Sequence, residues 1–242
     1  MKVFKFGGAS VKDASGVRNL VRVLETVGFR DTLVVVSAMG KTTNALEHII
    51  KVYFEDKQLV NQRVLELKEF HLRIVEDLFE NQVSQVIQEV YDCFEELNTF
   101  LKNNKAPNYS FVYDQVVSYG ELLSTTIIHH FFEYKGWKSY WLDARECIKT
   151  DDYYRSANLN WEHTLTSIKS QSKGHQLIIT QGFIGSNSNN FTTTLGREGS
   201  DYSAAIFAYA LNAESVTIWK DVPGVLNGDP RVFENTELLH QI

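Results

Sequence analysis

Apolar residues along this chain form two kinds of pattern, short continuous runs and longer stretches with helical spacing. The run at residues 3–6 ends in two glycines, and the β-branched run at residues 33–36 is continuous, as in a strand buried on both faces. Between the two runs, residues 12–27 have an apolar helical face formed by Val17, Leu20, Val21 and Leu24. This order of strand, glycine turn, helix and strand predicts the start of a parallel α/β sheet.

The middle of the chain, from about residue 42 to 102, has helical spacing. Apolar positions recur at this spacing in two successive segments, at Leu65, Leu72, Val75 and Phe79 and then at Val83, Val86, Val90 and Phe94. The polar stretch at residues 103–108 contains a proline and predicts a break, and a further helix is expected from about 113 to 134. We interpret residues from about 55 to 110 as a helical insertion.

Strand and helix signals alternate again toward the C-terminus. Strands are expected at residues 139–142, 177–180, 191–194 and 216–219, and an alanine-rich helix at residues 201–211. The chain has no internal repeat, low-complexity tract or clear interdomain linker. The sequence therefore predicts one α/β domain over residues 1–242 with a mostly helical insertion.

The composition narrows the class of protein. Of the 242 residues, 43% are hydrophobic and 22% charged, which is usual for a globular protein with a substantial core. The net charge of −6 argues against binding to nucleic acid or to an anionic membrane, and no apolar run approaches the ~20 residues of a membrane helix. The first residues do not form a signal peptide, so we expect a cytoplasmic protein in which Cys93 and Cys147 are free thiols.

Glycines and small polar residues follow apolar runs at residues 7–10, 37–40 and 195–201. In parallel α/β sheets, ligands collect at the carboxyl ends of the strands. Glycines there let backbone N–H groups approach phosphate oxygens, and the N-terminus of the next helix adds positive partial charge. Three such turns in one chain favour phosphate binding.

The charged residues beside these turns have two interpretations each. Lys5 is either a solvent-facing lysine of an edge strand or a compact charge that reaches a phosphate beside the paired glycines. Arg197 and Asp201 flank a glycine turn that opens a helix. There, Ser200 or Asp201 can cap the helix N-terminus, contact a substrate, or do both.

Other nucleotide-binding and metal-binding motifs do not match. Gly40-Lys41-Thr42 resembles the end of a P-loop, but Val35 stands where that motif has its first glycine. Neither the G-x-G-x-x-G motif nor the protein-kinase signatures occur in the sequence. The histidines have no metal-binding spacing, and we interpret the adjacent histidines at residues 129–130 as surface or packing residues. The sequence therefore predicts no protein-built metal site.

A series of stretches resembles, in order, the motifs of the amino-acid kinase superfamily and, within it, of the aspartate kinases. Residues 5–11 (KFGGASV) are similar to the family's Lys-Phe-Gly-Gly-Thr-Ser-Val, with Ala9 in place of threonine. The later motifs are matched by residues 36–44 (VSAMGKTTN), 118–124 (SYGELLS), 195–203 (LGREGSDYS) and 221–231, which contain DVPG and DPR. The resemblance spans nearly the whole chain.

This resemblance implies a fold and an activity. The fold would be a three-layer α/β/α sandwich with a mainly parallel, eight-stranded central sheet. The activity would be transfer of the γ-phosphate of ATP to the side-chain carboxylate of L-aspartate, giving 4-phospho-L-aspartate, the first step toward lysine, threonine and methionine. ATP would act with Mg²⁺, and a homodimer is plausible.

The resemblance also implies roles for individual residues. Lys5 would neutralise the transferring phosphoryl group, and Asp201 would organise the charged centre. Glu121 would receive the substrate ammonium and Arg197 would clamp a carboxylate. The full set of substrate-binding residues would be Ser37, Thr43, Glu121, Arg197 and Ser200. The nucleotide-binding set would be Lys5, Gly7, Gly8, Lys220, Asp221, Leu226 and Arg231.

Some positions depart from the family pattern. Glu198 stands where many relatives have glycine, Lys220 where threonine is frequent, and Leu226 where an aromatic residue is common. Catalytic domains of the family continue beyond the position of Ile242 into further core elements and regulatory domains, so we expect either a shortened piece of a longer protein or an incomplete nucleotide site. The alternatives are a kinase that acts on glutamate or its derivatives and a catalytically silent fragment that binds ATP or an amino acid.

Overall fold

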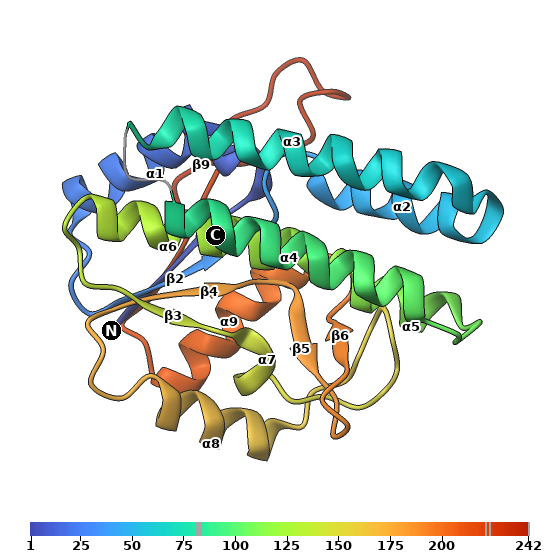
Figure 1. The fold of residues 1–242 in the computed structure, drawn as a ribbon. Helices are drawn as coiled ribbons and strands as arrows, with labels where there is room; N and C mark the ends of the chain where they lie inside the picture. The colour runs from blue at the N-terminus through green and yellow to red at the C-terminus, as the bar shows by residue number, and fades with distance from the viewer. Residues whose placement is uncertain (81–83, 221, 223, 242) are drawn as a thin grey trace.

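The computed structural model describes residues 1–80, 84–220, 222 and 224–241. Within them, the central sheet is five-stranded, all strands are parallel, and the order is β3-β4-β2-β1-β7 (Figure 1). The strands are β1 (Lys2–Phe6), β2 (Thr32–Val36), β3 (Tyr140–Leu142), β4 (Leu177–Gln181) and β7 (Ser215–Trp219). The expected parallel sheet is confirmed, but the expectation of eight strands is wrong for the described residues.

The buried strands are apolar on both faces because helices cover both sides of the sheet. One helical layer packs on Phe4 of β1 and Val34 of β2, and the other packs on Val3 and Leu33 of the same strands. Alternation of side chains along a strand sends neighbouring residues to opposite faces. The three-layer α/β/α arrangement is therefore confirmed.

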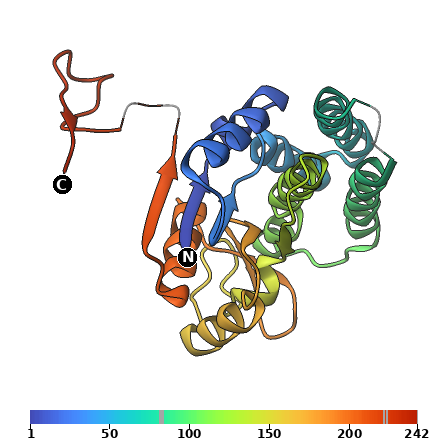
Figure 2. The same ribbon diagram turned by 90° about the vertical axis from the view of Figure 1, so that its left-hand side faces the viewer.

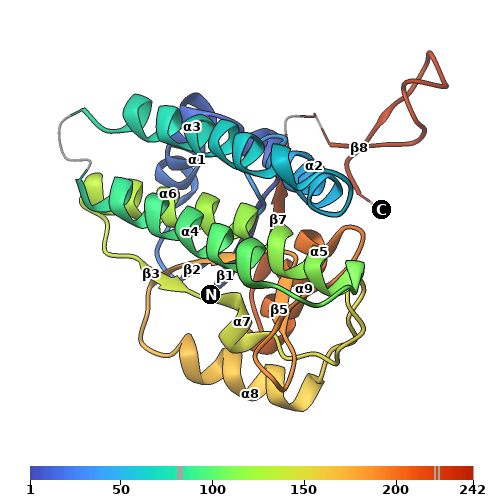
Figure 3. The same ribbon diagram turned by 45° about the vertical axis from the view of Figure 1, so that its right-hand side comes forward.

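The first layer is large and entirely helical. It consists of α1 (Ala14–Val27), α2 (Thr42–Glu55), α3 (Val60–Leu78), α4 (Ser84–Asn103), α5 (Tyr109–Val117) and α6 (Tyr119–Tyr134), with short 3₁₀ turns η1 (Gly8–Val11) and η2 (Lys57–Leu59). Figure 3 shows α3 and α4 side by side, in agreement with their tertiary contacts. The predicted apolar face of α1 is buried, and the predicted break at residues 103–108 separates α4 from α5.

Two details of this layer differ from expectation. Val75 and Phe79 are buried as predicted, but Leu65 is 48% exposed, and Val64 and Leu67 face the core in its place. The single helix expected at residues 113–134 is two helices, which meet at Ser118. Val83 lies outside the described residues.

The second layer consists of α7 (Ala144–Cys147), α8 (Trp161–Gln171) and α9 (Gly199–Leu211), which lie on the opposite side of the sheet in Figure 1. Hairpin β5 (Ile184–Ser186) with β6 (Thr192–Thr194) leads into α9 and is antiparallel. A second hairpin, β8 (Val225–Leu226) with β9 (Leu238–Leu239), stands apart from the body of the molecule in Figure 2.

Both cysteines, Cys93 and Cys147, are free, as expected. Among the described residues, no helix is long and apolar enough to cross a membrane.

Candidate active site

A cavity of about 250 Å³ lies where the carboxyl ends of β1 and β2 face the first turn of α9. The two strand ends are level, because Phe6 is in register with Val36 and accepts a hydrogen bond from the N–H of Ser37 at 3.1 Å. The cavity lining includes most of the predicted catalytic and substrate-binding residues, namely Lys5, Ser37, Thr43, Glu121, Ser200 and Asp201. Phe183, Gly196, Glu198 and Gly199 complete it.

Lys5 is buried in an interior strand, which rules out the edge-strand, solvent-facing interpretation. Its Nζ lies 2.6 Å from Oδ1 of Asp201, and Nζ of Lys220 lies 3.6 Å from Oδ2 of the same carboxylate. Partial burial opposes ionisation of Asp201, but the hydrogen bond and charge of Lys5, helped by Lys220, lower the pKa of Asp201 below its ordinary value. Asp201 is therefore a fixed anion that holds the two lysines together.

Glu121 lies in the first turn of α6, and its side chain is buried. Oε1 accepts a hydrogen bond from the backbone N–H of Ala38 at 3.1 Å. Oε2 has no hydrogen-bond partner among the described residues. Burial raises the pKa of Glu121 to about 8, against the opposing effect of the Ala38 N–H. A buried carboxylate with an open oxygen in a cavity can accept a cationic donor from a ligand.

The turns after β1 and β2 touch through their backbones. A Cβ at Gly8 would stand 2.5 Å from the carbonyl oxygen of Ala38, so only glycine fits there. The N–H of Gly40 donates to the carbonyl of Gly8 at 3.0 Å. Gly7 lies beside Lys5, since a Cβ on Gly7 would be 3.5 Å from Nζ. Gly7 and Gly8 thus expose backbone beside the buried lysine.

The turn before α9 contains left-handed backbone. Glu198 is the N-cap residue of α9, with φ of +56° and no side-chain capping bond. Its αL conformation explains why a glycine suits this position. Ser200 and Asp201 lie inside the first turn of α9, which excludes the interpretation that one of them is its N-cap.

Arg197 is the predicted substrate-binding residue that the cavity lining does not include. Its side chain is exposed, although its chain neighbours Gly196 and Glu198 both line the cavity. The structure thus brings Arg197 to the rim of the cavity, with its guanidinium outside it.

The predicted nucleotide-binding residues are only partly together. Lys5 lines the cavity, Gly7 and Gly8 follow β1 next to it, and Lys220 reaches the lining residue Asp201, whereas Asp221 is outside the described residues. Leu226 belongs to the outlying hairpin in Figure 2, and Arg231 forms an exposed ion pair with Asp229 at 2.8 Å. The structure does not bring Leu226 or Arg231 to Lys5.

Phe183 is a lining residue that sequence reasoning missed. It lies two residues after the end of β4, its φ is +70°, and its N–H donates to Oγ of Ser203 at 2.9 Å. Its position after the carboxyl end of a central strand was the available signal, because ligand sites form at such ends.

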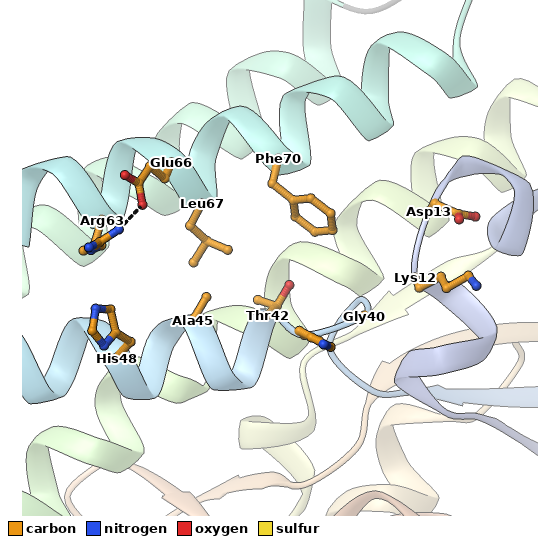
Figure 4. A pocket seen from close by; sticks show the side chains of 11 residues that line it. Lys12, Asp13, Gly40, Thr42, Ala45, His48, Arg63, Glu66, Leu67 and Phe70 are labelled. Carbon is orange, nitrogen blue, oxygen red and sulfur yellow. Dashed lines mark hydrogen bonds and ion pairs between the residues drawn. The ribbon is translucent and has the colours of Figure 1, made fainter.

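A larger cavity of about 610 Å³ lies between α2, α3 and the segment before α1 (Figure 4). Ala45, Leu67 and Phe70 give it an apolar wall, and Arg63 pairs with Glu66 at its border. It contains none of the predicted catalytic or binding residues. In the described part of the chain, no group of three or more His, Cys, Asp or Glu residues is placed to hold a metal ion. The smaller cavity is therefore the candidate active site.

Known proteins resemble this chain over its whole length. Lysine-sensitive aspartokinase 3 of Escherichia coli (strain K12) is 33% identical over 99% of this chain and 53% of its own length. Aspartokinase 2, chloroplastic, of Arabidopsis thaliana is 29% identical over 97% of this chain and 44% of its own. This chain thus spans about half the length of these curated relatives.

A solved aspartokinase structure also resembles this chain. Escherichia coli aspartokinase III in complex with aspartate and ADP superposes with a TM-score of 0.89 and 30% identity, covering 99% of this chain and 53% of that one. The sequence model of the amino acid kinase family matches residues 1–242. This chain, with its parallel sheet and its buried Lys5–Asp201 ion pair, belongs to the amino acid kinase family.

Proposed function

We propose that this chain forms the catalytic part of an aspartate kinase, which transfers the γ-phosphate of ATP to the side-chain carboxylate of L-aspartate. The observation that carries the proposal is the occurrence, in one small cavity, of a buried open carboxylate at Glu121 and of the Lys5–Asp201 ion pair, which Lys220 adjoins from outside the lining. The likeness to an aspartokinase that binds aspartate and ADP supports the same substrates.

The cavity suits a free amino acid that carries both charges. Oε2 of Glu121 is available to the substrate ammonium, and the hydroxyls of Ser37, Thr43 and Ser200 can donate to its carboxylate oxygens. Arg197 would clamp the α-carboxylate by turning inward from the rim, since its planar guanidinium can donate two parallel hydrogen bonds.

The transfer needs no strong base. A free aspartate side chain has a pKa of about 3.9, so the nucleophile is already ionised at neutral pH. Its carboxylate oxygen forms a bond to the γ-phosphorus while the bond to the β,γ-bridging oxygen breaks and ADP leaves. The difficulty is to bring two anions together, so positioning and cationic stabilisation dominate. Lys5, held by Asp201, would neutralise the moving phosphoryl group beside the backbone of Gly7 and Gly8.

ATP would enter as its Mg²⁺ complex. Asp201 is a carboxylate of the phosphate-facing cluster, and both of its oxygens lie near lysines. This donor set fits a cation carried mainly by phosphate oxygens and water, as is usual for Mg²⁺ at triphosphate sites. The ion would supply additional neutralisation of phosphate charge, while Lys220 and Lys5 bind from the protein side.

The first measurement is Mg-ATP binding by calorimetry, followed by aspartate-dependent ADP release in the same sample. Binding with aspartate-dependent turnover is the expected result. Turnover with glutamate in place of aspartate would indicate the glutamate-type alternative. A folded sample that binds Mg-ATP or aspartate without turnover would be a silent binding fragment.

Lys5→Met should lower kcat by about 10²–10³-fold, because a preorganised charge at the reacting phosphoryl group acts mainly in the transition state. The KM for aspartate should change little. Lys2→Met is the matched control on the same strand, since Lys2 is absent from the cavity lining, and it should behave as wild type. Equal losses in kcat and in aspartate binding would contradict the role of Lys5.

A further inference from the structure

Asp114 is a buried carboxylate that takes no part in lining the cavity. It sits on α5 and accepts hydrogen bonds from two segments, the turn that contains Arg155 and the end of β6. The N–H of Arg155 donates to Oδ1 at 3.1 Å and to Oδ2 at 3.0 Å. Thr194 donates its N–H to Oδ2 at 2.9 Å and its hydroxyl to Oδ1 at 2.8 Å. Burying an ionised carboxylate is costly, and these bonds are what make it tolerable.

Both segments held by Asp114 converge on Gly196, which lines the cavity. Thr194 ends β6, two residues before Gly196. Arg155 has left-handed backbone with φ of +72°, and its carbonyl oxygen would lie 3.2 Å from a Cβ on Gly196. The N–H of Ala157 also donates to the carbonyl of Thr194 at 2.9 Å, which ties the two segments together.

The side chain of Arg155 is anchored as well as its backbone. Its guanidinium lies 4.6 Å from the ring centroid of Tyr113, and the hydroxyl of Tyr113 donates to Glu47 at 2.9 Å. Glu47 is one turn after Thr43 on α2. The Gly196 side of the cavity is therefore linked to α5 through Asp114, and to α2 through the contact of Arg155 with Tyr113 and the hydrogen bond from Tyr113 to Glu47.

We propose that Asp114 is a positioning residue for the aspartate-binding half of the site, because it fixes the Gly196 turn and with it the place of Arg197 on the cavity rim. The inference rests on the proposed function. Asp114 acts through Arg155 and Thr194, without touching substrate. Lys5 lies on β1 and Lys220 directly follows β7, away from the Gly196 turn, so the effect of Asp114 falls mainly on aspartate and much less on ATP.

The kinetic test compares Asp114→Ala and Asp114→Asn with wild type. Asp114→Ala should raise the KM for aspartate about 10-fold or more, since a displacement of the order of 1 Å in positioning groups can cost up to about 100-fold. The KM for ATP should change by less than about 3-fold. Asp114→Asn should restore much of the aspartate affinity, because one oxygen can still accept from the N–H groups of Arg155 and Thr194.

A matched pair of threonines separates positioning from general loss of stability. Thr194→Val removes the hydroxyl bond to Asp114, and Thr193→Val removes an equally buried hydroxyl that pairs with Thr150 at 2.7 Å. Only Thr194→Val should raise the KM for aspartate. Loss of folded protein alone would lower the apparent kcat and leave both KM values unchanged, which would overturn the proposal, as would equal rises in both.

A second readout does not depend on turnover. In ¹⁵N-labelled protein, Asp114→Ala, or Thr194→Val where the alanine variant fails to fold, should shift the amide resonances of Gly196 and Gly199. Thr193→Val should leave them in place. Unmoved resonances in the folded Asp114→Ala or Thr194→Val protein would overturn the positioning role. Absence of aspartate turnover in the wild type would instead defeat the proposed function, and the amide shifts would still decide the role of Asp114.

Discussion

At the scale of the residue, the buried carboxyl of Glu121 couples the candidate site to pH. Burial raises the pKa of Glu121 to about 8, so at neutral pH the unliganded protein holds this group largely protonated. A substrate ammonium beside Oε2 would favour the ionised form and lower that pKa again. Substrate binding at neutral pH should therefore release a proton from Glu121.

The same raised pKa has a consequence for stability. The folded-state pKa of Glu121 lies above its ordinary value of 4.5. The contribution of Glu121 to the free energy of unfolding is therefore fully present below about pH 4.5 and is lost as pH rises through about 8. Between these limits, wild type should lose roughly 1.4 kcal/mol per pH unit relative to Glu121→Gln. Urea unfolding of both proteins at pH 5 and pH 8 measures this difference, and an unchanged difference would show that Glu121 titrates normally.

Individual site residues were predictable where a motif placed them at the end of a strand or in the first turn of a helix. Lys5, Glu121 and Asp201 were identified in this way and do line the cavity. The outward direction of Arg197 and the left-handed backbone of Glu198 were not, because they depend on how the turn at Gly196 is held by residues distant in sequence.

At the scale of elements, the site depends on how closely α6 approaches the turn after β2. Gly120 precedes Glu121 and makes this approach possible. A Cβ at Gly120 would lie 2.8 Å from Cβ of Ala38 and 3.3 Å from both Cδ1 of Leu46 and Cγ2 of Thr42. The bond from the Ala38 N–H to Glu121 therefore requires glycine at this point in α6.

Gly120→Ala should destabilise the protein by about 1–3 kcal/mol through overpacking. This loss opposes the gain of about 1 kcal/mol that alanine normally gives over glycine in a helix. Asn19→Ala is the control, an exposed position in α1 that should be neutral or slightly stabilising. Chemical denaturation of wild type, Gly120→Ala and Asn19→Ala measures their free energies of unfolding. A Gly120→Ala protein more stable than wild type would show that α6 can move to accommodate the methyl group.

Elements were easier to predict than their pairing. Local apolar periodicity located α1, α9 and the strands of the central sheet. It could not show that β5 pairs with β6 and β8 with β9 outside that sheet, because pairing is set by long-range contacts. The break at Ser118 was missed for a related reason. Apolar residues continue through it, and its hydroxyl bonds back to the carbonyl of Gln115.

At the scale of the whole molecule, the C-terminal hairpin contributes little to the core. Val225, Val232 and Phe233 are all more than half exposed, and the hairpin stands apart in Figure 2. The family resemblance implies a role for Leu226 and Arg231 in nucleotide binding, but in this structure they lie away from Lys5. Stability and nucleotide affinity should therefore respond differently to its removal.

Deletion of residues 225–241 should change Tm by less than about 2 °C, because surface segments with few buried contacts contribute little to unfolding free energy. The Kd for Mg-ATP should rise, and Arg231→Ala in the intact chain should reproduce part of that rise. Differential scanning calorimetry measures Tm, and isothermal titration measures the Kd for Mg-ATP, in wild type, the deletion and Arg231→Ala. An unaltered Kd in the deletion would remove Leu226 and Arg231 from the nucleotide site.

The register of β1 also determines when the central sheet can be completed during synthesis. Its residues Lys2–Phe6 pair on one side with Thr32–Val36 and on the other with Ser215–Trp219. At about 5–20 residues per second, the first strand waits on the order of ten seconds or more for its second neighbour to leave the ribosome. Asp201 reaches Lys5 only near the end of that interval. The Lys5–Asp201 ion pair thus forms only after most of residues 1–242 have been synthesised, and an N-terminal fragment that ends before α9 carries the lysine without its partner.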